Sequence, residues 1–199
     1  MEAAELYHAE HVELPLKLGS RCDLSARHAL ARVERLAQVS ERYHDDLPLL
    51  WVEGRDLVSG GSRWLPLECV SADFTAPPGP GAGCFDNSSN GLASGNSLTE
   101  AICHGLCELI ERDATALWNA AADSVATTGL DLASVTDAPC RRVIRQIEAA
   151  GFDLRVWETT SDIAVAGFFC QIVDLRDARG HSGVGAGVHP CREIALMRA

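Results

Sequence analysis

Four side chains that can bind metal or transfer protons recur along one segment of the sequence: Glu100, His104, Glu108 and Glu111. They are four, four and three residues apart, a spacing that stacks side chains along one ridge of an α-helix. Stacked carboxylates repel one another, and a purely structural helix usually alternates Glu with Lys. Because Mg²⁺ prefers carboxylate oxygens as ligands, the ridge indicates a metal site. The alternative is a solvated helix face, which often carries such a row.

A loop with accessible backbone amides is predicted just before this ridge. Residues 87–95 consist mainly of Asn, Ser and Gly, which are the residues of exposed turns. Ser97 followed three residues later by Glu100 is a capping-box pattern, which places the start of the helix at Ser97. A Gly-rich loop that leads into a helix N-terminus suits phosphate oxygens. Loop and carboxylates together predict a nucleotide-phosphate site in which a metal ion bridges protein and phosphates.

The helix that carries these groups is predicted to run from Ser97 to Trp118. Apolar residues recur along it at three- and four-residue steps and gather on the face opposite the carboxylates. They are Leu98, Ile102, Gly105, Leu106, Leu109, Ala116 and Leu117. Cys107 falls on the acidic face and Arg112 at its border. The run from Thr99 to Thr115 contains no Lys, so Arg112 carries its one fixed positive charge.

The whole chain has the composition of a globular protein with a hydrophobic core. It has 199 residues, of which 47% are hydrophobic and 23% are charged, enough for one sizeable domain or two small ones. With 28 acidic and 17 basic residues the formal net charge is −11, which argues against nucleic acid or an anionic membrane as a partner. No apolar run approaches membrane-spanning length, and the acidic N-terminus does not resemble a signal peptide, so a cytoplasmic location is expected.

Eight cysteines are scattered through the sequence without a C-x-x-C pair. A disulfide framework is not expected in a chain of this size without a secretion signal. Cys103 and Cys107 lie one helical turn apart with His104 between them, a pattern that could seed a zinc site. Because no second Cys/His pair with ligand spacing occurs elsewhere, buried free thiols are the favoured interpretation and zinc is the weaker alternative.

Helical and β-rich segments along the chain predict an α+β fold. Helices are expected from the N-terminus to about residue 11 and over residues 26–39, 137–150 and 193–199; strands are expected over residues 49–58, 63–71, 152–158, 165–175 and 182–188. Residues 77–83 are rich in Pro and Gly and predict an irregular connection or a mobile lid. Because the chain begins inside one helical pattern and ends inside another, it is expected to be truncated at both ends.

The segment from Ser89 to Ala114 resembles the YcaO family. It reads SNGLASGNSLTEAICHGLCELIERDA and is long enough to be specific. The opening residues, MEAAELYHAE, are similar to the first acidic helix of that family, and residues 185–199 are similar to the start of a later helix. The resemblance covers essentially the whole chain. It implies a single partial YcaO domain over residues 1–199, with a mixed β-sheet layered with α-helices.

The resemblance implies ATP and Mg²⁺ as cofactors and peptide modification as the activity. Characterised members of the family phosphorylate the oxygen of a peptide backbone amide. A Cys, Ser or Thr side chain then attacks the amide carbon to give an azoline, or external sulfide attacks it to give a thioamide. The activity expected of the parent protein is therefore cyclodehydration or thioamidation. The alternative is a non-catalytic YcaO-type module that binds a precursor peptide or a partner protein.

The resemblance also implies which residues form the site, because their positions match the motifs of the family. No catalytic residue is assigned. The nucleotide-binding residues implied by the resemblance are Glu2, Glu5, Asn96, Glu100, Arg112 and Arg198. The implied metal ligands are Glu2, Glu5, Glu100, Glu108 and Glu111. Two positions depart from the family pattern: Leu6 stands where many members have Arg, and Ala93 stands where the family is often polar.

The expected partner is a peptide or protein substrate, together with a second protein that delivers the peptide or the sulfur. Exposed helix edges in a truncated chain also leave room for a homodimer. Nucleic acid and membranes are not expected as partners. The resemblance implies that upstream and C-terminal segments complete the active site of the family, so this part of the protein is expected to be incompetent for catalysis by itself.

Overall fold

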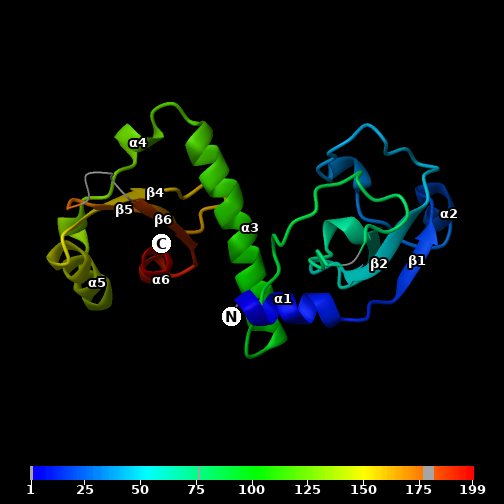
Figure 1. The fold of residues 1–199 in the computed structure, drawn as a ribbon, viewed down its shortest axis with the longest axis horizontal. Helices are drawn as coiled ribbons and strands as arrows, with labels where there is room; N and C mark the ends of the chain where they lie inside the picture. Colours follow the sequence, from blue (N-terminus) through cyan, green and yellow to red (C-terminus); the bar gives the residue numbers. More distant parts are fainter. Residues whose placement is uncertain (1, 76, 177–181) are drawn as a thin grey trace. The chain divides into compact units, whose positions relative to one another are not determined.

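The structure is a computed structural model that describes residues 2–75, 77–176 and 182–199, with side chains from Glu5 onward (Figure 1). Backbone contacts divide the chain into two compact units, Met1–Ser94 and Gly95–Ala199. Each unit contains a hydrophobic core and a three-stranded antiparallel sheet of its own. The two units are therefore described separately.

The first unit is built around a sheet of order β1-β2-β3. Its elements are α1 (Glu2–His11), β1 (Leu16–Gly19), α2 (Arg21–Ser25), η1 (Val33–Arg35), β2 (Leu49–Arg55), β3 (Ser62–Pro66) and η2 (Leu67–Cys69). Trp51 in the central strand is fully buried, and its indole Nε1–H donates to the carbonyl oxygen of Gly19 at 2.8 Å. Phe85 and Trp64 belong to the same core. The two strands expected here are confirmed, although both end earlier than predicted.

The helix predicted over residues 26–39 is wrong. Part of this stretch runs alongside β3 instead. The N–H of Ala31 donates to the carbonyl oxygen of Trp64 at 2.8 Å, and the N–H of Trp64 donates to the carbonyl oxygen of Ala29 at 2.9 Å. The backbone groups that a helix would pair locally are thus paired with a strand far along the sequence.

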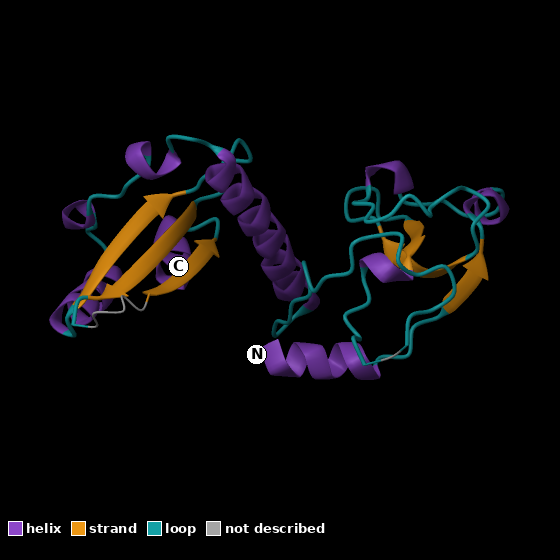
Figure 2. Ribbon diagram, turned by 45° about the horizontal axis from the view of Figure 1, so that its top comes forward, coloured by secondary structure: helices purple, strands orange, loops and turns teal. Residues whose placement is uncertain are grey.

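The second unit has helices on both faces of the sheet β4-β5-β6 (Figures 1 and 2). Its elements are α3 (Leu98–Ala120), α4 (Ser124–Thr127), η3 (Leu132–Ser134), α5 (Ala138–Ala149), β4 (Phe152–Glu158), β5 (Gly167–Asp174), β6 (Ser182–Val188) and α6 (Arg192–Arg198). α5 and α6 lie over the face that carries Val156 and Cys170. Trp118 of α3 packs on Trp157 and Phe169, which point to the opposite face.

α3 begins at its predicted capping residue, and α5 matches the helix expected over residues 137–150. Ser97 caps α3, and its Oγ accepts the N–H of Glu100 at 3.2 Å. Asp137 caps α5, and Gly151, with a φ of 84°, follows its end. Within the described residues, every helix is too short or too polar to span a lipid bilayer.

The α+β class is confirmed, but the single mixed sheet is corrected to two antiparallel sheets. Parallel pairing requires a long crossover between strands. β2 and β3 are instead joined by a hairpin that turns at Gly60, whose φ is 71°, and the connection between β4 and β5 contains no helix. The strands therefore return directly beside their predecessors.

The apolar face of α3 is not the face that packs on the sheet. Leu98, Leu106 and Leu117 are 77%, 47% and 53% exposed. Cys107 and Ala114, on the other side, are buried where α3 contacts β5 and β6. The acidic side of α3 thus lies toward the sheet. Helical periodicity groups the residues of α3 into two faces, but it could not tell which one a neighbouring element covers.

Candidate nucleotide-phosphate site

The first turn of α3 brings Asn96 and Glu100 together. The Glu100 carboxylate accepts the backbone N–H of Asn96 at 2.9 Å and its side-chain Nδ2–H at 3.1 Å. The predicted capping box is therefore half formed, because Ser97 caps the amide of Glu100 while the Glu100 carboxylate reaches one residue farther back. Both Asn96 and Glu100 are exposed. A carboxylate at an accessible helix N-terminus suits a hydrated cation that carries phosphate oxygens.

Gly95 determines how the backbone enters this turn. A Cβ at this position would lie 2.6 Å from the backbone nitrogen of Ala101 and 2.8 Å from Cβ of Glu100, which is closer than such atoms approach. Only glycine lets the loop fold this tightly onto the start of α3. A backbone without a side chain at such a point can also approach phosphate oxygens closely.

Farther along α3, the carboxylates meet other protein groups. The Glu108 side chain is 22% exposed, and its Oε1 lies 3.4 Å from Nη2 of Arg112. Glu111 is half-buried and accepts the backbone N–H of Val188, at the end of β6. Burial raises the pKa of the Glu111 carboxyl, while the positive charges of Arg112 and Arg198 act to lower it. Glu111 therefore interacts with groups from α3, β6 and α6. The end of α3 that carries Glu108 and Glu111 is thus not simply a solvated helix face.

The cysteines give no support to the zinc alternative. Cys103 is exposed and Cys107 is buried, and all eight cysteines are free thiols. Burial raises the pKa of the Cys107 thiol, which disfavours the thiolate that zinc binds. In residues 5–75, 77–176 and 182–199, no group of three or more His, Cys, Asp or Glu side chains could hold a metal ion.

A nucleotide-bound Mg²⁺ needs fewer protein ligands than a structural zinc ion does. A nucleotide-bound Mg²⁺ takes one or two protein carboxylates, because phosphate and water oxygens supply its other ligands. In the second unit, the carboxylates of the predicted site are Glu100, Glu108 and Glu111. Their donor chemistry fits a Mg²⁺ ion that arrives with a nucleotide and does not require a cage made by protein alone.

Glu5 belongs to the first unit, where it is bound to the loop that precedes α3. Its Oε1 accepts the N–H of Ser94 at 2.8 Å and the Oγ–H of Ser94 at 2.6 Å. Ser94 was not among the predicted residues, because nothing in the sequence distinguishes it from the neighbouring serines. The side chain of Glu2, the other predicted ligand of α1, lies outside the described residues.

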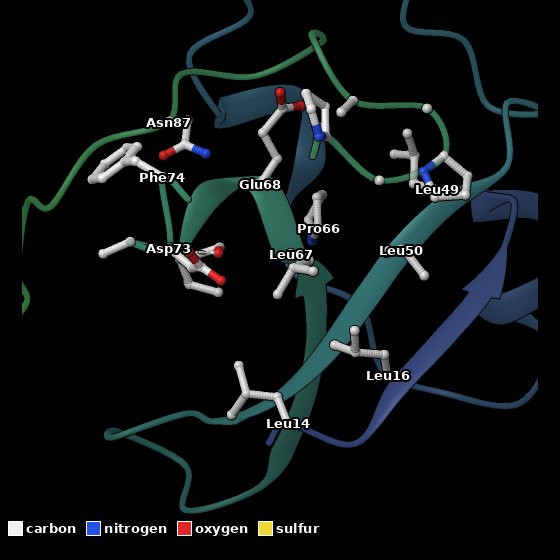
Figure 3. A pocket seen from close by; sticks show the side chains of 18 of the residues that line it. Leu14, Leu16, Leu49, Leu50, Pro66, Leu67, Glu68, Asp73, Phe74 and Asn87 are labelled. Atoms are coloured by element: carbon white, nitrogen blue, oxygen red, sulfur yellow. Dashed lines mark hydrogen bonds between the residues drawn. The ribbon is translucent and has the colours of Figure 1, made fainter. Parts of the chain in front are cut away.

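An apolar pocket of about 740 Å³ lies elsewhere in the first unit (Figure 3). Its lining includes Leu14, Leu16, Leu50 and Phe74. The predicted nucleotide and metal ligands with described side chains do not line it. Such a lining suits hydrophobic groups, whereas phosphate requires amides and charge. This pocket is therefore not the nucleotide-phosphate site.

The family of the chain follows from its match to a sequence model of known proteins. The model described as YcaO cyclodehydratase, ATP- and Mg²⁺-binding, matches residues 1–199. The chain belongs to the YcaO family. The match includes the acidic α1, the loop and helix of residues 89–114, and α6, so the three segments on which the resemblance was based all fall within it.

Curated relatives of this YcaO chain are longer proteins. An uncharacterized protein in the tfuA 3′ region of Rhizobium leguminosarum bv. trifolii is 35% identical over 207 residues, which covers 100% of this chain and 49% of that protein. An uncharacterized protein of Methanothermobacter thermautotrophicus is 32% identical over 153 residues, covering 76% of this chain and 39% of that one. The chain thus spans half or less of the length of these relatives.

Solved structures share the YcaO fold at low sequence identity. A heterocyclase in complex with substrate and cofactor matches with a TM-score of 0.80 at 22% identity, covering 100% of this chain and 29% of that chain. The YcaO protein of Methanopyrus kandleri bound with AMPPCP and Mg²⁺ matches with a TM-score of 0.66 at 20% identity, covering 100% of this chain and 48% of that one. At these identities the likeness establishes the fold, and function has to be argued from the site.

Proposed function

We propose that this YcaO chain binds ATP with Mg²⁺ and that the whole protein uses it to activate a peptide backbone amide for azoline formation. The family description names cyclodehydration, ATP and Mg²⁺, and one related structure holds a nucleotide analogue with Mg²⁺. The observation that carries the proposal is the orientation of α3, whose Glu111 lies at β6 within reach of the charge of Arg198 in α6. A helix with only a structural role would cover its leucines on that side instead.

Each group of the second unit has a role that its surroundings support. Asn96 and Glu100 would hold Mg²⁺ and orient the phosphates at the start of α3. Arg112 and Arg198 would neutralise phosphate oxygens. Glu111 has a pKa that burial raises, and a nearby metal ion would favour its ionised form.

The remaining predicted ligands are proposed on the family resemblance together with their chemistry. Glu108 would support Arg112, with which it pairs at 3.4 Å. Glu5, and Glu2 one helical turn before it, would add carboxylates from α1. Their oxygens are of the type that Mg²⁺ takes alongside phosphates.

The chemistry that such a site serves is phosphoryl transfer to an amide oxygen. ATP supplies the γ-phosphoryl group, and ADP is the leaving group. A Cys, Ser or Thr side chain of the peptide then adds to the amide carbon, phosphate departs with the former amide oxygen, and the peptide has lost one water. Attack by external sulfide would give a thioamide from the same activated amide. The contribution of the protein is positioning and charge stabilisation.

Calorimetry with AMPPCP and Mg²⁺ tests the binding step on this chain. Glu100→Gln and Glu111→Gln are each expected to weaken Mg²⁺-dependent nucleotide binding by about tenfold or more, the usual effect of losing a group that supports a metal ion. Asp113→Asn is the matched control, because Asp113 is an exposed carboxylate on the same helix. Wild-type affinity in both Glu100→Gln and Glu111→Gln, as in the control, would refute the assignment of the site.

Turnover is tested on the whole protein with a peptide substrate. Phosphate release that depends on peptide, together with loss of water from the peptide in mass spectrometry, is the expected result. Replacement of oxygen by sulfur would indicate thioamidation. Nucleotide binding without phosphate release on addition of peptide would instead identify a non-catalytic module.

A further inference from the structure

Ser94 makes two hydrogen bonds to a single carboxylate oxygen. Its backbone N–H and its Oγ–H both donate to Oε1 of Glu5, at 2.8 Å and 2.6 Å. The two residues are 89 positions apart in the sequence, and both are half-buried in the first unit. The contact thus joins the middle of α1 to the last residue of the first unit's final loop.

Two donors on one oxygen hold a carboxylate in a defined orientation. Hydrogen bonds to an ionised acceptor are shorter and stronger than neutral ones, and the Oγ–Oε1 distance of 2.6 Å lies in that range. Helix geometry does not require them, since Glu5 lies inside α1 and not at a cap. Carboxylates that ligate metal ions are themselves usually hydrogen-bonded by a second layer of residues, which orients them toward the ion.

We propose that Ser94 is a positioning residue that orients the Glu5 carboxylate toward the Mg²⁺ of the bound nucleotide. The inference rests on the proposed function, because it assigns to Glu5 a role in Mg²⁺ binding. Of the two donors, the backbone N–H remains in any variant except proline, whereas the hydroxyl is specific to Ser or Thr. Ser94→Ala therefore removes the hydrogen bond from the hydroxyl and keeps the one from the backbone N–H.

The test is a Mg²⁺ titration of the chain at a fixed concentration of a fluorescent ATP analogue. Ser94→Ala is expected to raise the Mg²⁺ concentration for half-saturation by about tenfold, the lower end of the effect of removing such a supporting group. Ser94→Thr, which keeps the hydroxyl, is expected to restore the wild-type value. Ser62→Ala is the matched control, because the Ser62 hydroxyl donates to the carboxylate of Glu53 in the β2–β3 hairpin of the same unit.

A double-mutant cycle separates positioning from a merely structural contact. Because Ser94 acts through Glu5, adding Ser94→Ala to Glu5→Gln is expected to cause no further change in the Mg²⁺ requirement. A structural contact alone would lower the unfolding temperature in Ser94→Ala and leave the Mg²⁺ requirement unchanged, and that result would overturn the inference. If the wild-type chain binds the nucleotide without needing Mg²⁺, or does not bind it, the proposed function fails first and this inference fails with it.

Discussion

Glu68, in η2, accepts hydrogen bonds from three consecutive backbone amides. Its Oε1 accepts the N–H of Gly83 at 2.5 Å, and its Oε2 accepts those of Cys84 and Phe85, each at 3.1 Å. Cys84 and Phe85 are 0% and 1% exposed, so water cannot take over as their acceptor. Glu68 also forms part of the wall of the apolar pocket (Figure 3). Glu68→Ala would therefore leave two buried donors unsatisfied.

The expected magnitude follows from those two donors. A buried donor left without an acceptor costs about 1–3 kcal/mol, so Glu68→Ala is expected to lower the free energy of unfolding of the first unit by about 2–6 kcal/mol. Glu68→Gln keeps one acceptor oxygen but turns an NH₂ group toward a backbone donor, and about half of that loss is expected. A loss of this size is a large fraction of the 5–15 kcal/mol or so that stabilises a typical domain.

Hydrogen exchange followed by mass spectrometry measures this effect unit by unit. The amides of residues 83–85 are expected to exchange much faster in Glu68→Ala, while those of β4 and β5 keep their protection. Glu41→Ala, which removes an exposed glutamate of the same unit, is the control. Unchanged protection at residues 83–85, with an unchanged urea midpoint, would show that the carboxylate does not hold these amides.

Two further predictions concern the pH dependence of the second unit. Burial raises the pKa of Glu111, so its contribution to stability is complete below the ordinary pKa of about 4.3 and is lost as the pH rises through the raised value. Without nucleotide, Glu111→Gln should therefore stabilise the chain at pH 7, by about 0.5 kcal/mol because solvent screens a half-exposed group. Equal melting temperatures of wild type and variant would contradict this. The hydrogen bonds from Arg192, at 2.7 Å and 2.9 Å, lower the pKa of Glu158. That stability is present above about pH 4.3 and lost as the pH falls. Urea unfolding from pH 6 to pH 3 should show a loss of about 0.5–1 kcal/mol that is absent in Glu158→Gln.

Local signals in the sequence were sufficient for the helices that carry the site. The cap at Ser97 was predicted from neighbouring residues, and it is present. A cap and its first turn are completed within four residues, so distant parts of the chain do not decide them. The two strands on either side of Gly60 were likewise expected from local composition.

Features that depend on distant residues were not predicted. The stretch around Ala31 has a helical pattern, but its backbone pairs with Trp64. The contact between Glu5 and Ser94 spans most of the first unit and has no local signature. Which face of α3 is covered likewise depends on distant residues, because α3 packs against β5 and β6. The small Cys107 and Ala114 are buried, whereas the leucines are exposed.

Two glycines of β6 determine how closely α6 can approach the sheet of the second unit. A Cβ at Gly185 would lie 2.2 Å from the carbonyl oxygen of Ala199, and one at Gly187 would lie 2.4 Å from that of Ala195 and 2.8 Å from Cβ of Arg198. α6 therefore lies directly on the backbone of β6. Because neither glycine has a Cβ, the charge of Arg198 is held close to the sheet. Even alanine at either position would push α6 away from the strand and displace the Arg198 guanidinium with it.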